Sequence, residues 1–161
     1  ALKDRRGPLT IELVLFDGEE AVVDWAGTDH TYGSREYVAN ARRDGSLAQI
    51  RAMVLVDMIG DRNLRIRREQ FSTRWLTDLF WASAGRLGHS DVFTAESMAV
   101  EDDHLPFLEA GIPAVDLIDL EYPAWHTEAD TIEQISAGSL QIVGDVLLDA
   151  LPAVEARLMG R

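Results

Sequence analysis

The feature that most constrains this chain is an apolar run that stops at a glycine and two adjacent glutamates. Residues 11–16 are largely apolar, and Gly18, Glu19 and Glu20 follow after one aspartate. A run of this kind is typical of a strand buried inside a parallel sheet. In open α/β sheets, ligands bind at the carboxyl ends of such strands. The stretch therefore predicts a strand at 11–16 with two carboxylates at a functional sheet edge.

Strands and helices alternate along the rest of the chain. Apolar or alternating runs predict strands at 52–59, 64–67, 91–100 and 113–118. Apolar residues at helical spacing predict helices at 34–43, from 72 to Gly85 or Gly88, at 104–110, and from 132 onward. The arginines of the 64–67 strand place it at a sheet edge. This order predicts one domain, 1–161, folded as a three-layer α/β sandwich with a mostly parallel sheet.

Capping residues set the expected helix starts. Ser34 and Ser72 each precede a predicted helix, and Asp102 or Asp103 precedes the short one. Serine and aspartate are favoured N-caps because their side chains accept hydrogen bonds from the first free backbone amides. Capping is therefore one interpretation of each of these four residues.

Composition excludes several classes of function. The formal net charge is −13, which argues against nucleic acid or an anionic membrane as partner. No apolar run long enough to span a membrane is apparent, and the first residues given do not resemble a signal peptide. The chain has no cysteine, so any metal must be held by Asp, Glu and the four histidines.

Acidic residues and one histidine gather where predicted strands end. Glu19, Glu20 and Asp57 follow strands, Asp102 opens a helix, and His126 lies in the loop after the last strand. Such a set suits one zinc ion or two, because one carboxylate can hold the ion while its neighbour moves a proton. The alternative interpretations are a strand-end acid bonded to loop amides for Asp57, and a plain cap for Asp102.

Loop residues offer further candidates. Trp25 and Trp125 lie in predicted loops, where each could pack on a neighbour or form the wall of a pocket. His30 and His89 also lie beside acids, in hydrophilic loops where solvated surface is the simpler interpretation.

Five motifs occur in this chain order: Phe16–Ala21 with Trp25 and residues 32–35; residues 54–60; residues 101–108; residues 111–113; and residues 125–127. Together they resemble the animal-type glutaminyl cyclases, which share their fold with zinc-dependent aminopeptidases of the leucine aminopeptidase type. The resemblance covers nearly the whole chain. It is more specific for the superfamily than for cyclase against peptidase.

The resemblance implies a role for each site residue. Glu20 and His126 would be zinc ligands and Glu19 the catalytic acid/base. Asp57 and Asp102 would hold the hydrogen-bond network around Glu19 in a cyclase. In a two-metal aminopeptidase, Asp57 would instead bind the second zinc. Trp25, Trp125 and Asp116 would line the substrate pocket.

Two departures from the family pattern stand out. The family's remaining zinc ligand is an aspartate on the N-terminal side of the Gly-Glu-Glu strand, and the residues before Ile11 contain no such motif. We therefore expect an N-terminally incomplete domain that lacks its first strands. The animal cyclases also carry a histidine where this chain has Asp116.

The expected activity is zinc-dependent formation of N-terminal pyroglutamate on peptides with a free N-terminus. The long loop with Trp25 between Glu20 and Gly33 favours a cyclase. The alternatives are an aminopeptidase of the same superfamily and a non-catalytic fragment of the fold. We also expect possible self-association of the incomplete domain. Its compartment is undetermined, although the family resemblance suggests secretion or a periplasmic location.

Overall fold

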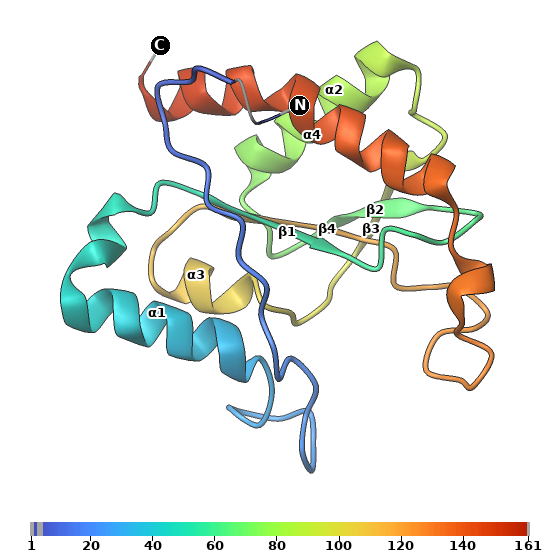
Figure 1. Cartoon of the computed structure of the whole chain (residues 1–161), viewed down its shortest axis with the longest axis horizontal. Helices are drawn as coiled ribbons and strands as arrows, with labels where there is room; N and C mark the ends of the chain where they lie inside the picture. The colour runs from blue at the N-terminus through green and yellow to red at the C-terminus, as the bar shows by residue number, and fades with distance from the viewer. Residues whose placement is uncertain (1, 3–4, 161) are drawn as a thin grey trace.

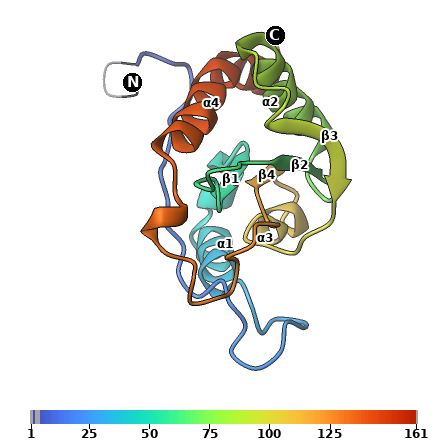
Figure 2. The same ribbon diagram turned by 90° about the vertical axis from the view of Figure 1, so that its right-hand side faces the viewer.

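The computed structural model describes residues 2 and 5–160, which form three layers (Figure 1). The central strands are β1 (Met53–Asp57), β2 (Ile66–Glu69), β3 (Phe93–Met98) and β4 (Ala114–Ile118). Figure 2 shows α1 and α3 on one side of the strands and α2 and α4 on the other. The helices are α1 (Tyr32–Asp44), α2 (Arg74–Leu87), α3 (Leu105–Glu109) and α4 (Ala137–Leu158), with 3₁₀ turns at Ser46–Gln49 and Ile132–Gln134. The predicted three-layer α/β architecture is confirmed.

The four strands lie in the spatial order β1, β4, β2, β3. β1 pairs with β4 and β2 pairs with β3, and both ladders are parallel. Between the two pairs, the amide of Thr73 donates to Ala114 O (2.7 Å), and the amide of Arg65 donates to the carboxylate of Asp119 (2.8 Å). The end of β2 therefore meets the start of β4, so these two strands run in opposite directions.

β2 has one ladder partner, β3, so the edge expected at residues 64–67 is present, but it faces β4 instead of solvent. Its arginines have another use, since Arg65 pairs with Glu96 and Arg67 pairs with Glu121 (2.6 Å). Basic residues beside a strand thus satisfied acidic partners here rather than protecting an open edge.

The two faces of β4 bury different cores. Val115 and Leu117 pack with residues of α2 and α4, such as Phe80 and Val143. Ala114 packs with Val38, Phe107 and other residues on the side of α1 and α3. Successive side chains of a strand point to opposite faces. Asp116 therefore lies on the face covered by α1 and α3.

Helix α4 begins five residues later than the sequence predicted. Its cap is Ser136, whose hydroxyl accepts from the amides of Gly138 (3.1 Å) and Ser139 (3.4 Å). By length and composition, α4 is the one described helix that could cross a membrane, which sequence inspection had not singled out. Its face with Val146, Ala150 and Val154 is buried in the core, while Leu140 and Leu148 are partly exposed.

The predicted strand at 11–16 is not formed. The segment has no ladder partner in the described part of the chain, and Leu13 and Leu15 are 82% and 98% exposed. Only Phe16 at its end packs inside, against Tyr37 and Phe107. A parallel strand is stable only between neighbours that satisfy its amides and cover its faces. Here the segment passes the sheet as irregular chain (Figure 1).

The two serine caps predicted from the sequence are also wrong. Helix α1 begins at Tyr32 after Thr31, whose φ is 52°, and α2 begins after Thr73. The hydroxyls of both serines instead bind carboxylates, Ser34 that of Asp103 (2.5 Å) and Ser72 that of Glu69 (2.8 Å).

Candidate active site

Backbone hydrogen bonds fix the Gly-Glu-Glu segment to the start of α1. The amides of Thr31, Tyr32 and Gly33 donate to the carbonyls of Glu19 (2.7 Å), Gly18 (2.8 Å) and Asp17 (3.1 Å). The first amides of a helix have no partner within the helix, so these carbonyls take the place of a side-chain cap. Gly18 adopts φ +61°, a conformation that glycine tolerates without steric cost. Glu19 and Glu20 are thereby held at one end of α1.

Glu19, Asp57 and Asp102 lie close enough for their charges to act on one another. Burial and the neighbouring charges of Glu20, Asp103 and Asp57 raise the pKa of Glu19 to about 7. Burial, together with Asp57 and Glu19, raises the pKa of Asp102 to about 8. Burial also raises the pKa of Asp57, at the end of β1. Close carboxylates cannot all be ionised at neutral pH, so this cluster holds protons.

Asp102 and Asp103 do not cap α3 with their side chains. The carboxylate of Asp102 accepts from the amide of Asp103 (2.6 Å), while Asp103 accepts from Ser34. His104 occupies the N-cap position without a side-chain cap bond. The capping interpretation is therefore wrong, and both acids are buried beside Glu19.

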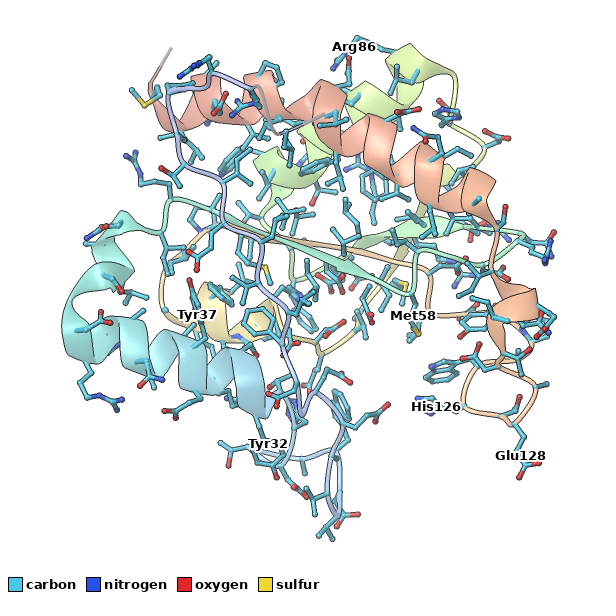
Figure 3. The ribbon with its side chains drawn as sticks, viewed as in Figure 1. Tyr32, Tyr37, Met58, Arg86, His126 and Glu128 are labelled. Atoms are coloured by element: carbon cyan, nitrogen blue, oxygen red, sulfur yellow. The ribbon has the colours of Figure 1, made fainter. Side chains whose placement is uncertain are left out.

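Glu20 and His126 meet at the surface. Nε2 of His126 lies 3.2 Å from Oε1 of Glu20, and the two side chains are 59% and 67% exposed. His126 has φ 55° and stacks on Trp125, with 4.2 Å between ring centroids. Figure 3 shows His126 on the loop after β4, below Met58 at the end of β1. Two residues 106 positions apart are thus brought to ligand distance of one point.

The donor set meets only part of what zinc needs. A catalytic zinc takes three protein ligands and keeps one position open. A carboxylate and an imidazole at 3.2 Å have the right chemistry for two of these ligands. Among the described residues, no group of three or more His, Cys, Asp or Glu side chains could hold a metal ion. The pair therefore offers at most two of the three protein ligands that a catalytic zinc would need.

The two loop tryptophans each stack on a histidine. Trp25 lies parallel to His30, with 4.6 Å between centroids, and Trp125 lies on His126. Both indoles remain partly exposed, at 41% and 38%. His30 itself is buried and lies 3.8 Å from Glu101, so its interpretation as solvated surface is wrong. Trp125 therefore lies against the histidine that meets Glu20, while Trp25 packs on the separate, buried His30.

Sequence reasoning missed His104 and Glu69, which lie next to Asp116. All three side chains are fully buried, and Nε2 of His104 is 3.1 Å from Oε2 of Glu69. Asp116 was expected to line a pocket, and the structure places it inside the protein on β4. The sequence does place His104 directly after Asp102 and Asp103, but we interpreted these residues as the start of the helix that is now α3.

Comparison with known proteins gives the family. The model of peptidase family M28 matches residues 1–151. A curated glutaminyl-peptide cyclotransferase from Boiga irregularis is 32% identical over 164 residues, which is 88% of this chain and 45% of that protein. The chain therefore spans about half the length of the curated relatives that it matches.

Solved structures show the same likeness. A glutaminyl cyclase from an Acidobacteriales bacterium is 44% identical with a TM-score of 0.84, over 88% of this chain and 52% of that one. A leucine aminopeptidase precursor from Bacteroides thetaiotaomicron is 26% identical with a TM-score of 0.73, over 84% and 50%. The chain belongs to peptidase family M28, and its structural neighbours include both cyclases and peptidases.

Proposed function

We propose that this chain carries part of the catalytic site of a glutaminyl cyclase, an enzyme that closes an N-terminal glutamine of a peptide into pyroglutamate. The observation that carries the proposal is Glu19, a half-buried carboxylate whose pKa is raised to about 7 beside the Glu20–His126 pair. A general acid/base works best when its pKa lies near the working pH. The 44% identity to a bacterial glutaminyl cyclase supports the same choice.

In this reaction Glu19 moves one proton. The carboxylate accepts a proton from the α-amine as that nitrogen attacks the side-chain amide carbon of the glutamine. The same proton then passes to the amide nitrogen, which leaves as ammonia when its bond to carbon breaks. The nearby carboxyl groups of Asp103 and Asp57 help burial and Glu20 to keep the pKa of Glu19 raised. The exposed faces of Trp25 and Trp125 offer apolar surface to the peptide's first residue.

Zinc is the cofactor we propose, with Glu20 and His126 as two of its ligands. Because two exposed ligands bind weakly, calorimetric titration of the 161-residue chain should give weak binding that His126→Ala abolishes. His89→Ala, in the loop between α2 and β3, is the matched control. Tight binding that survives His126→Ala would place the metal elsewhere.

The activity is tested with aminoacyl fluorophores bearing glutamine or leucine, using the protein in its natural length. Ammonia release from the glutaminyl compound without release of the fluorophore supports the cyclase. Fluorophore release from the leucyl compound would instead identify an aminopeptidase, the second candidate favoured by the 26% identity to a leucine aminopeptidase precursor. If the protein in its natural length forms neither product and also binds zinc only weakly, the domain is non-catalytic.

A further inference from the structure

Glu69, His104 and Asp116 form a buried row beneath the carboxylate cluster. They come from the end of β2, the N-cap of α3 and the middle of β4, and none is exposed. No Lys or Arg pairs with any of the three side chains in the described part of the chain. His104 therefore lies between the two carboxylates, with Nε2 3.1 Å from Glu69 and Nδ1 3.9 Å from Asp116.

Glu69 is built to be ionised. Its carboxylate accepts from the amides of Phe71 (2.9 Å) and Ser72 (2.6 Å), from the hydroxyl of Ser72 (2.8 Å), and from His104. Burial by itself would raise the pKa of Glu69, but the hydrogen bonds from His104, Phe71 and Ser72 outweigh burial and lower it. An ionised carboxylate only accepts, so Nε2 of His104 must carry a hydrogen.

Asp116, unlike Glu69, has no hydrogen bonds to its carboxylate among the described residues. Both of its carboxylate oxygens and Nδ1 of His104 are buried without a hydrogen-bond partner among the described residues. Oδ2 and Nδ1 are 3.9 Å apart, so a shift of about 1 Å would close a hydrogen bond. Buried polar groups without partners are costly, which favours that closure.

Other acids around Asp116 decide its charge. The titratable groups that act on it are Asp57 on β1, Glu69 on β2, and Asp102 and Asp103 before α3. All four are negative when ionised, and burial together with their charges raises the pKa of Asp116. Asp116 therefore needs either a proton of its own or a cation at Nδ1.

We propose that His104 is a positioning residue for Asp116. Its Nε2–H donates to Glu69, which fixes the ring, and its Nδ1 shares one proton with the carboxyl group of Asp116. The shared proton lies on Asp116 or on Nδ1 and stays within the pair, so the pair is neutral in either form. Asp116 then faces Asp57, Glu69, Asp102 and Asp103 without adding a further negative charge to theirs. The inference rests on the proposed function for its catalytic consequence, but its geometry does not.

Nitrogen-15 NMR of the histidine-labelled chain tests the geometry without any activity. We expect His104 to show a protonated Nε2, and its Nδ1 resonance to move in Asp116→Asn, because an asparagine can donate a hydrogen bond but cannot share a proton. Asp91→Asn, in an exposed loop, is the control and should leave His104 unchanged. A bare Nε2, or an Nδ1 resonance that is the same in Asp116→Asn, would overturn the proposal.

Kinetics of the protein in its natural length test the positioning role. His104→Gln keeps a donor toward Glu69 and removes Nδ1. We expect kcat to fall about tenfold or more and its pH profile to shift, with KM changed less, as when a partner that orients a functional group is lost. His89→Gln is the matched control. Unchanged kcat and pH profile in His104→Gln would overturn the role.

The two measurements separate the possible failures. If the unaltered protein releases no ammonia, the proposed function fails and the NMR result still decides whether His104 and Asp116 share a proton. If His104→Gln does not fold, the spectrum of Asp116→Asn still decides whether His104 and Asp116 share a proton.

Discussion

Adjacent glutamates acquire different chemistry because their surroundings differ. Glu19 is partly buried against Asp57 and Asp103, and its pKa is raised to about 7. The side chain of Glu20 is two-thirds exposed and reaches His126. A raised pKa suits proton transfer, while an exposed carboxylate beside an imidazole suits metal binding. One peptide bond thus separates the two roles that we propose for these glutamates.

Glu19→Gln tests the division between the two glutamates. Glutamine keeps the size of the side chain but cannot take a proton, so turnover should fall about 10²–10⁴-fold. Zinc affinity should stay close to that of the unaltered protein, because Glu20 and His126 are untouched. A variant that turns over at nearly the normal rate would assign the proton transfer to another residue.

Among the elements, α1 and the 17–19 segment depend on one another through Gly33. A Cβ atom at residue 33 would lie 2.4 Å from the carbonyl oxygen of Asp17, an approach that only glycine permits. The close packing brings the helix amides onto the carbonyls that precede Glu20. The site is therefore positioned by main chain, where sequence periodicity carries no signal.

Gly33→Ala should lower the free energy of unfolding by about 1–3 kcal/mol, because the segment must move away from α1. Gly144→Ala, in α4, is the matched control. A Cβ there meets nothing within 4 Å, and alanine is favoured over glycine in a helix by up to about 1 kcal/mol. Urea unfolding followed by circular dichroism measures both. Equal stability of Gly33→Ala and the unaltered chain would show that this contact is not made.

The sequence could predict those elements for which the local pattern of apolar residues is sufficient information. Continuous apolar runs correctly predicted β1 and β4, and helical spacing predicted α2. Residues 11–16 have the same local pattern as β1 but no paired neighbour, and sequence alone does not reveal that difference. Likewise Glu69 and His104, 35 residues apart, meet only because β2 ends beside α3. The convergence of Glu20 and His126 was predicted from the family motifs and from an expected position at strand ends, although the strand expected before Glu20 is not formed.

For the whole molecule, the buried acids make stability depend on pH. The folded-state pKa of Asp102 is raised to about 8, above its value of about 4 in an unfolded chain. Between those values the folded state binds more protons than the unfolded state, so stability falls as pH rises.

We expect the free energy of unfolding to be higher at pH 5.5 than at pH 8, with a slope of up to about 1.4 kcal/mol per pH unit for each retained proton. Asp102→Asn should flatten this slope, because asparagine does not titrate. Thermal unfolding in matched buffers gives the comparison. A chain that becomes more stable toward pH 8 would contradict a raised pKa for Asp102.

The exposed apolar residues before Asp17 should also govern assembly. Leu13 and Leu15 are almost entirely in water, in a segment whose amides have no ladder partner in the described structure. Such a segment favours pairing with another chain. We expect concentration-dependent self-association in sedimentation velocity, and Leu15→Asp should weaken it. A monomer at every concentration would remove this expectation.

The most direct test of the central claim is mass spectrometry of an unmodified peptide that begins with glutamine. The peptide is incubated with the protein in its natural length and, separately, with its Glu19→Gln variant. If the protein is a glutaminyl cyclase with Glu19 as its acid/base, the intact peptide should lose one ammonia and keep all its residues. Almost no ammonia should be lost with Glu19→Gln. Loss of the first residue, or equal conversion by both proteins, would contradict it.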